Sequence, residues 1–380
     1  MSVHIAVADS AGADGATLRR MGGSSIPSSL RVALIGFGPG GAYFHAPLIA
    51  TTPGLTLSVV VTSDEGRRAQ ALRDYSGVAV VASAAELWDR SSEIDLVVIA
   101  TPNRSHAPLA LAAFDHGIHV VVDKPFAVTA AEGRTAADAA RTAGRLLIPY
   151  QNRRWDGDFL TVRALLAQGA FGTVHHFESR FDRWRPQPTG SWRESSEPGV
   201  AGGLLYDLGS HLIDQALLLF GPVAGVYAEL DMRRPGVTAE DDVFVSLTHV
   251  SGVRSHLHAS ALAAQATPRF RVSGSAASLV KWGLDVQEAA LKAGMKPGGD
   301  AWGQEPPERW GMLGTETASA PVPTHPGNYP AFYAGVVAAV RGDAPPPVQI
   351  HEAIAMLDVI EAAQRSARER RVVELSASSA

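Results

Sequence analysis

The sequence predicts an α/β protein with an N-terminal doubly wound Rossmann domain and a C-terminal α+β domain built on an open, mainly antiparallel sheet. Three observations predict this fold. A glycine-rich turn follows an apolar strand at residues 31–35, short apolar strands then alternate with helical segments up to residue 149, and longer strands of alternating polarity follow. A chain of 380 residues has room for two such domains.

The composition excludes several classes of protein. A net charge of -5 without a long basic run argues against a nucleic-acid or membrane-surface partner. The sequence has no cysteine, which excludes disulfides and thiolate metal sites and suits a reducing cytoplasm, the expected location. No apolar segment reaches the roughly 18 to 20 residues of a membrane helix. Residues 1–29 are rich in Ala, Gly and Ser and are interpreted as a disordered tail, with Met21 as an alternative start.

The first strand leads into a glycine motif of the G-x-G-x-x-G type. Its first glycine permits a tight turn, its second lets backbone amides approach a pyrophosphate, and its third lets the following helix pack close to the strand. A glycine-rich turn can also be only a turn, but the position between strand and helix favours a dinucleotide site. The predicted contacts of the pyrophosphate are Gly36, Phe37, Gly38 and Gly41.

Further strands are predicted at 55–61, 78–81, 94–100, 119–122 and 146–150, which gives a Rossmann domain over residues 30–149 and a substrate-binding and oligomerisation domain over 150–380. Ligands of parallel sheets bind beyond the carboxyl ends of the strands. Two motifs at such ends, which begin at Thr101 and Asp123, are therefore expected to face the cofactor. The alternative is that the charges of Asp123 and Lys124 only solvate a loop.

The end of the second strand bears on the choice of nicotinamide cofactor. NAD enzymes usually place a carboxylate there for the ribose hydroxyls, but this chain has Thr62 and Ser63. Arg67 and Arg68 follow within reach of a 2'-phosphate, so NADP is preferred over NAD. Asp64 leaves the choice open, because its carboxylate either binds the ribose or repels the phosphate. The two arginines are alternatively a solvated helix face.

The second half contains the stretch "GGLLYDLGSHLIDQ", in which Asp207 and His211 stand four residues apart. On a helix, this spacing places both side chains on one face, where they can serve one substrate. The alternative interpretation is an N-cap aspartate and a core histidine.

Together, the glycine turn, "DKP" and "GGLLYDLGSHLIDQ" resemble the glucose-fructose oxidoreductase/inositol dehydrogenase/MocA (Gfo/Idh/MocA) family, whose usual E-K-P appears here as Asp123-Lys124-Pro125. The strings "FHAPLI", "NRRWDGDFLTV" and "PGNYPAFY" look most like its NADP-dependent scyllo-inositol dehydrogenases. The resemblance implies that Lys124 bonds the reacting hydroxyl, that His211 is the general acid/base and that Asp207 orients the substrate and the histidine. Which of Lys124 and His211 accepts the proton stays open.

The resemblance also implies further contacts around the reacting groups. The family's "TPNxxH" motif matches residues that pass under the nicotinamide ribose, although its histidine alternatively packs its own helix. These cofactor contacts are Thr101, Pro102, Asn103 and His106. Relatives often have histidine where this chain has Gln151, so the role of that position is open. The predicted substrate contacts are Asn152, Arg153, Arg154 and Tyr329, together with Trp192 and Arg193, whose aromatic face and guanidinium group suit a polyol. Trp192 and Arg193 alternatively pack within their long loop.

The segments after residue 170 alternate in polarity like strands of an antiparallel sheet. In relatives the free face of such a sheet builds the subunit interface, so a homodimer or homotetramer is expected. His256 and His258 share one strand face but lack a third ligand, and no metal is expected. The sequence thus predicts an NAD(P)-dependent oxidoreductase acting on a secondary alcohol of a cyclic polyol or sugar, scyllo-inositol being the best single substrate. The alternatives are an aldose or keto-sugar oxidoreductase and a non-catalytic dinucleotide-sensing regulator.

Overall fold

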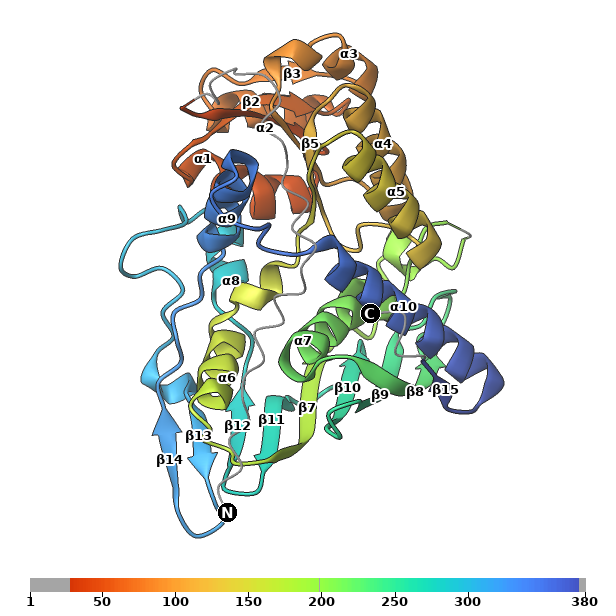
Figure 1. Ribbon diagram of the computed structural model, residues 1–380, viewed down its shortest axis with the longest axis vertical. Coiled ribbons are helices and arrows are strands. Elements are labelled where there is room, and N and C mark those ends of the chain that lie inside the picture. The colour runs from red at the N-terminus through yellow and green to blue at the C-terminus, as the bar shows by residue number, and fades with distance from the viewer. Residues whose placement is uncertain (1–27, 198, 376–380) are drawn as a thin grey trace.

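The computed structural model describes residues 28–197 and 199–375. Apart from its last two residues, the predicted tail of residues 1–29 lies outside the described residues, and so does Met21. Among the described helices, none combines the length and the apolar character needed to cross a membrane. The chain forms two sheets, one at the top of Figure 1 and one at the bottom, with helices between and around them.

The first sheet is parallel throughout and has the strand order β3-β2-β1-β4-β5-β6, as expected for a doubly wound fold. Its central strands consist of buried, mostly β-branched residues, which suits strands covered on both faces. The strand order reverses between β1 and β4, and this switch point is where such sheets bind ligands. The strands are β1 (Leu30–Ile35), β2 (Leu55–Val61), β3 (Ala79–Val81), β4 (Leu96–Ile99), β5 (His119–Val122) and β6 (Leu147–Pro149).

Helices cover both faces of this sheet, and three of them begin at a side chain that caps the helix. The Asp64, Ser83 and Thr129 side chains each accept a backbone N–H of the following helix. The glycine turn leads first into a π-helical turn (Gly40–His45) and only then into regular helix. The helices are α1 (Ala46–Thr51), α2 (Glu65–Asp74), α3 (Ala84–Trp88), α4 (His106–Asp115) and α5 (Ala130–Thr142).

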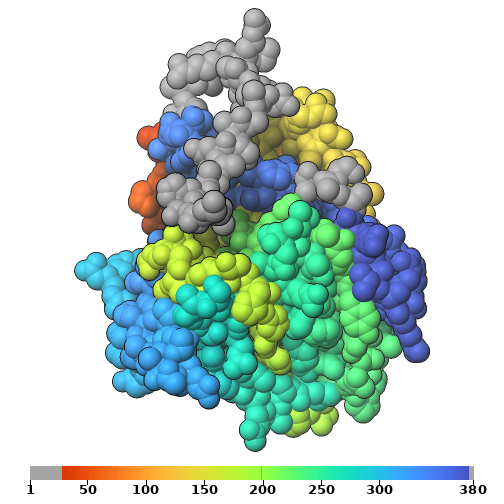
Figure 2. Space-filling model, turned by 60° about the horizontal axis from the view of Figure 1, so that its bottom comes forward, coloured from red at the N-terminus to blue at the C-terminus, as the bar shows by residue number. Residues whose placement is uncertain are grey.

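The second sheet has nine strands in the order β14-β13-β12-β11-β7-β10-β9-β8-β15. All neighbouring pairs are antiparallel except β7 with β10, so the prediction of a mainly antiparallel sheet is confirmed. Figure 2 brings this end of the molecule forward. The strands are β7 (Val174–Asp182), β8 (Val223–Asp231), β9 (Asp242–His249), β10 (Arg254–Ser260), β11 (Pro268–Gly274), β12 (Ser278–Trp282), β13 (Gly311–Gly314), β14 (Ser319–Val322) and β15 (Val373–Glu374).

Helices from the second half connect the two sheets. Helix α10 packs against β8 of the second sheet and against α5, one of the helices that cover the first sheet. Helix α9 lies beside α1 (Figure 1). One hydrophobic cluster therefore runs from the Rossmann strands through α10 to the second sheet. This packing fixes the junction at which the candidate active site lies. The helices are α6 (Gly157–Ala167), α7 (Ser210–Phe220), α8 (Gln287–Lys292), α9 (Pro330–Arg341) and α10 (Ile350–Glu369).

Candidate active site

The glycine turn lies at the carboxyl end of β1, and its geometry fits a dinucleotide. Gly36 has φ +96°, and a Cβ there would lie 2.5 Å from the carbonyl oxygen of Ala100, while a Cβ on Gly41 would overlap the carbonyl oxygen of Gly36. At Gly38, by contrast, the nearest atom is 3.8 Å away. Two glycines thus permit close backbone packing and the middle one leaves open space, as a pyrophosphate cradle requires. The Phe37 side chain is buried and contacts Tyr75 edge to face.

The end of β2 holds the residues that were predicted to distinguish NADP from NAD. Asp64 Oδ1 accepts the backbone N–H of Arg67 at 2.8 Å, so this carboxylate caps α2. The atom nearest to the Cβ position of Gly38 is Nη1 of Arg67, which therefore lies beside the glycine turn. Arg68 instead donates from Nη1 to the carbonyl oxygen of Val80 on β3, at 3.0 Å. Thr62 is buried and Ser63 is exposed at the strand end.

The turn after β4 is braced against the turn after β5. Both ring nitrogens of His106 lie 2.8 Å from a backbone carbonyl oxygen, one of Thr101 and one of Pro125. A neutral imidazole donates only one N–H, so only one of these contacts is a hydrogen bond when the ring is neutral. Asn103 donates from Nδ2 to the carbonyl oxygen of Ala201, which ties this turn to the segment before α7. Pro102 lies exposed between these braces.

Lys124 and Asp207 form an ion pair across the junction of the two halves. Lys124 Nζ donates to the carbonyl oxygen of Asp207 and to its Oδ1, the latter at 3.1 Å, and Arg193 Nε lies 3.4 Å from the same Oδ1. Burial alone would raise the pKa of Asp207, but the charges of Lys124 and Arg193 lower it to about 2. Asp207 lies in a π-helical turn (Leu205–Gly209), and Gly209 holds the N-cap position of α7, so the N-cap interpretation of Asp207 is wrong.

His211 is buried one turn beyond Asp207, with 4% of its surface exposed. Its Nδ1 has no hydrogen-bond partner among the residues described. Burial, reinforced by the nearby positive charges of Lys124 and Arg153, lowers the pKa of His211 well below its usual value. The imidazole is therefore neutral at neutral pH, which is the form with a ring nitrogen free to accept a proton, and the same shift makes it a weaker base than an ordinary histidine.

A cavity joins the motifs that the sequence separates. It brings together residues that follow β4 and β5 with residues of the loop before α7, and seven of the predicted site residues line it. Its lining residues are Thr101, Asn103, His106, Asp123, Lys124, Pro125, Trp192, Arg193, Ala201, Gly203 and Asp207. The Arg193 guanidinium stacks on the Trp192 ring, 4.6 Å from its centroid.

Three of the other four predicted substrate contacts, Arg153, Arg154 and Tyr329, have internal partners. Arg154 pairs with Asp214 at 2.6 Å and with Glu352 at 2.7 Å, and Arg153 pairs with Glu288. The hydroxyl of Tyr329 is fully buried and donates to Asp156 Oδ1 at 2.7 Å. Asn152 is buried in the same short turn as the two arginines. These contacts hold the segment after β6 against the second half of the chain.

Three polar residues near Lys124 had been assigned no catalytic role from the sequence. His45 Nδ1 lies 2.6 Å from the hydroxyl of Tyr333, and its Nε2 lies 3.7 Å from Asp123 Oδ2. Burial alone would raise the pKa of Asp123. The neighbouring His45 and Lys124 outweigh this effect and lower the pKa to about 2. Both amide atoms of Gln151 are buried without a hydrogen-bond partner in the described ranges. Pro149 pairs with Val122, so Gln151 stands two residues beyond β6 just as Lys124 stands two residues beyond β5. This position at a strand end is the feature of the sequence that could have identified Gln151 as a candidate site residue.

The two strand histidines pair with neighbouring side chains. His256 Nδ1 lies 3.0 Å from His176 Nε2, and His258 Nδ1 lies 2.7 Å from Asp182 Oδ1. Within residues 28–197 and 199–375, no three His, Cys, Asp or Glu side chains are grouped as metal ligands.

Two family models match the chain. The one described as the NAD-binding Rossmann fold of an oxidoreductase family, Gfo/Idh/MocA, matches residues 30–151, and the C-terminal alpha/beta domain of the same family matches residues 163–375. The chain belongs to the Gfo/Idh/MocA oxidoreductase family. It is therefore an oxidoreductase with a dinucleotide-binding domain, and the resemblance drawn from the motifs is confirmed.

Individual relatives cover nearly the whole chain. The uncharacterized oxidoreductase YdgJ of Escherichia coli is 44% identical over 92% of this chain and 99% of its own length. The scyllo-inositol 2-dehydrogenase (NADP(+)) IolW of Bacillus subtilis is 35% identical over 91% of this chain and 96% of its own length. A solved oxidoreductase structure from Bacillus cereus superposes with a TM-score of 0.81 at 28% identity and covers 92% of this chain and 99% of that one.

Proposed function

We propose that this oxidoreductase transfers a hydride between a secondary alcohol of a cyclic polyol or sugar and NADP, with scyllo-inositol and its 2-keto form as the best single substrate pair. The observation that carries the proposal is the Lys124–Asp207 ion pair beyond β5, with a neutral His211 one turn further along the chain. The relative IolW, named for this reaction, supports the choice of substrate.

The donors of Lys124 suggest how the residues divide the chemistry. An ammonium group has three N–H donors, and two of those on Lys124 are directed to the carbonyl oxygen and Oδ1 of Asp207. The third is left for the oxygen of a substrate hydroxyl. A bound nicotinamide supplies the hydride-accepting carbon. Neutral His211, with its free Nδ1, takes the hydroxyl proton during oxidation and returns it during reduction. Asp207 holds Lys124 in position.

The preference for NADP rests on Arg67. Its guanidinium lies beside Gly38, whereas the Asp64 carboxylate is engaged as the cap of α2. A 2'-phosphate bound at the end of β2 would therefore meet a positive charge there. Arg68 supports the site less directly, because its Nη1 is bound to the carbonyl oxygen of Val80. NAD lacks the 2'-phosphate, so in an NAD complex the Arg67 charge would meet only the pyrophosphate that both cofactors share.

A homodimer or homotetramer formed through the outer face of the second sheet is also proposed. Side chains of β7 on that face, including His176, Glu178 and Arg180, are only partly exposed and pair with one another or with β10. Light scattering on the purified chain measures the mass directly. A monomer at micromolar concentration would contradict this assembly.

The function is tested by the absorbance of reduced nicotinamide, with scyllo-inositol, myo-inositol and a small panel of aldoses, each run with NAD and with NADP. Turnover of an inositol with NADP is expected. Turnover of aldoses alone would reassign the substrate while retaining the site. Demonstrable cofactor binding without turnover of any alcohol would instead favour the sensing regulator.

A further inference from the structure

We infer that the substrate of this enzyme carries an anionic group, a carboxylate or a phosphate, which Arg183 and Arg185 bind in a second cavity beside Asp207. The inference rests on the proposed hydride transfer and revises its substrate, because an anionic derivative of a cyclic polyol or sugar replaces neutral scyllo-inositol as the expected substrate.

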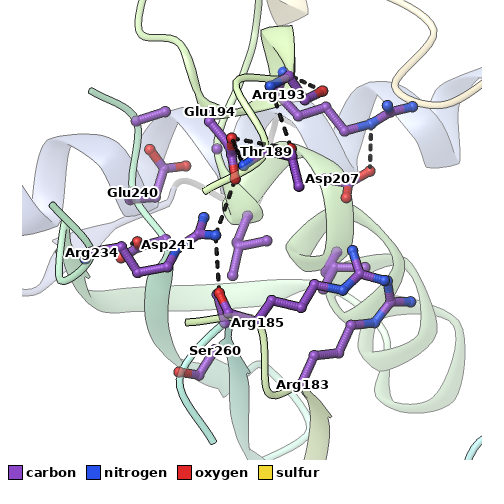
Figure 3. Close-up of a pocket in the computed structure, with 16 residues that line it drawn as sticks. Arg183, Arg185, Thr189, Arg193, Glu194, Asp207, Arg234, Glu240, Asp241 and Ser260 are labelled. Atoms are coloured by element: carbon purple, nitrogen blue, oxygen red, sulfur yellow. Dashed lines mark hydrogen bonds and ion pairs between the residues drawn. The ribbon is translucent and has the colours of Figure 1, made fainter. Parts of the chain in front are cut away.

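The second cavity adjoins the first. The two share Arg193, Gly203 and Asp207 in their linings, so a molecule held at Lys124 has direct access to both. The second cavity lies between the loop after β7 and the ends of β8, β9 and β10. Its side-chain charges come from Arg183, Arg185, Arg193, Arg234, Glu194, Asp207, Glu240 and Asp241 (Figure 3).

Three of the four carboxylates of this lining contact a cation, and the fourth, that of Glu240, accepts a backbone N–H. Asp207 contacts Lys124 and Arg193, as described above. Arg234 contacts both Glu194, at 3.0 Å, and Asp241, at 2.8 Å. Glu240 Oε1 accepts the backbone N–H of Leu205 at 3.2 Å. The lining contains four arginines and four carboxylates, so its formal charges sum to zero. Only Arg193 and Arg234 form ion pairs with these carboxylates, and the other two arginines form none.

Those two arginines are Arg183 and Arg185. Their backbone N–H groups bond to the carbonyl oxygens of Ser260 and Ala261, which fixes the segment along the end of β10. Among the described residues, their guanidinium groups have no hydrogen bond or ion pair, although both side chains extend into the cavity (Figure 3). Burial lowers the pKa of Arg183, against the effect of Glu288, and the nearby charges of Arg185 and Arg153 lower it further. Arg183 is half-buried and Arg185 is exposed, and an anion held between the two groups would offset the repulsion between their charges.

The anion belongs to the substrate because of where the cavity lies. The proposed contact for the cofactor's 2'-phosphate is Arg67, at the end of β2 beside the glycine turn. Arg183 instead follows β7, and it lies close enough to Asp207 for the carboxylate charge to raise the pKa of Arg183. Guanidinium groups bind carboxylate and phosphate oxygens through paired N–H donors, which suits two arginines directed at one group. A neutral polyol would leave both charges without an anion.

The test compares matched compounds on the full-length protein with NADP. kcat/KM is measured for D-glucose, D-glucuronate and D-glucose 6-phosphate, and for myo-inositol and myo-inositol 1-phosphate. In at least one set, an anionic member is expected to exceed its neutral parent by at least ~10-fold, because charge-assisted hydrogen bonds are the strong ones. The glucuronate and phosphate arms show which anion is preferred.

Variants assign the preference to the two arginines. The double variant Arg183→Gln/Arg185→Gln should lower the ratio of anionic to neutral kcat/KM by at least ~10-fold, whereas Arg183→Lys/Arg185→Lys should keep most of it, because the charge is retained. Arg254→Gln removes an exposed arginine on β10 and is the matched control, for which the ratio should not change. A ratio at or below one in every set, or a ratio that survives in the glutamine variant, would overturn the inference.

A binding measurement distinguishes failure of the proposed function from failure of the inference about the two arginines. If none of the compounds turns over, titration calorimetry of the same compounds against NADP-loaded protein decides the inference separately. Binding of an anionic compound at least ~10-fold tighter than its neutral parent, lost in the glutamine variant, would support the arginine site alone. Equal binding of both, or no binding of either, would refute it.

Discussion

Replacing Lys124 with methionine removes the charge of the central ion pair and keeps most of its volume. The pKa of Asp207 is lowered from 3.8 to about 2, which at 1.36 kcal/mol per unit corresponds to about 2 kcal/mol in favour of the carboxylate. A carboxyl group with a lowered pKa contributes this stability above its unfolded-state pKa and loses it as the pH falls toward 2. At pH 7 the contribution is fully present in the native chain. Both side chains are less than one third exposed, so solvent screening is limited.

Lys124→Met should therefore lower the free energy of unfolding at pH 7 by about 2 kcal/mol, because the half-buried Asp207 carboxylate loses its closest cation and keeps only the longer ion pair with Arg193. Urea denaturation measures this loss, and the double variant Lys124→Met/Asp207→Asn should recover part of it. The same replacement should lower kcat by at least ~10², with NADP affinity retained. Lys296→Met, at an exposed loop lysine, is the control. A kcat within tenfold of the native value would refute the assigned role of Lys124, and unchanged stability would refute the electrostatic reasoning.

Three further predictions concern other parts of the site. Because burial and nearby cations lower the pKa of His211, kcat/KM for alcohol oxidation should stay level as the pH is lowered from 8 to 6.5, and a loss centred near 6.5 would contradict this. Arg67→Ala should raise the Kd of NADP by roughly 10-fold and that of NAD less than ~2-fold, with a smaller effect for Arg68→Ala, in a fluorescence titration. Equal losses for both cofactors would mean that Arg67 does not contact the phosphate. Arg154→Met should lower the free energy of unfolding by about 3 kcal/mol, since it leaves Asp214 buried without its partner. Unchanged stability with a raised KM would instead place Arg154 on the substrate.

The sequence predicted the Rossmann strands well because their signals are local. The bounds of β2 and β5 match the predicted ranges, since runs of β-branched residues there end at turn-forming or charged residues. The predicted regular helix around Asp207 was less accurate. A π-helical turn precedes α7, and no periodicity distinguishes one extra residue per turn in so short a segment.

Side-chain partners far apart in the chain were beyond reach of the sequence. Arg154 resembled an exposed ligand-binding residue, yet its partners stand 60 and 198 residues away. The contact between His45 and Tyr333 spans 288 residues. These contacts depend on how α7, α9 and α10, which carry the partner residues, pack against the Rossmann half of the chain. Motifs at strand ends were easier, because the parallel sheet itself brings the segments that begin at Thr101 and Asp123 to one edge.

The central claim is that His211 moves the proton of the reacting alcohol. The most direct measurement is single-turnover reduction of NADP by excess alcohol, followed by stopped-flow absorbance in the native chain and in His211→Asn. The account predicts a rate lowered by at least ~10² in the variant, with the Kd of NADP changed less than ~3-fold. A single-turnover rate near the native value would contradict it.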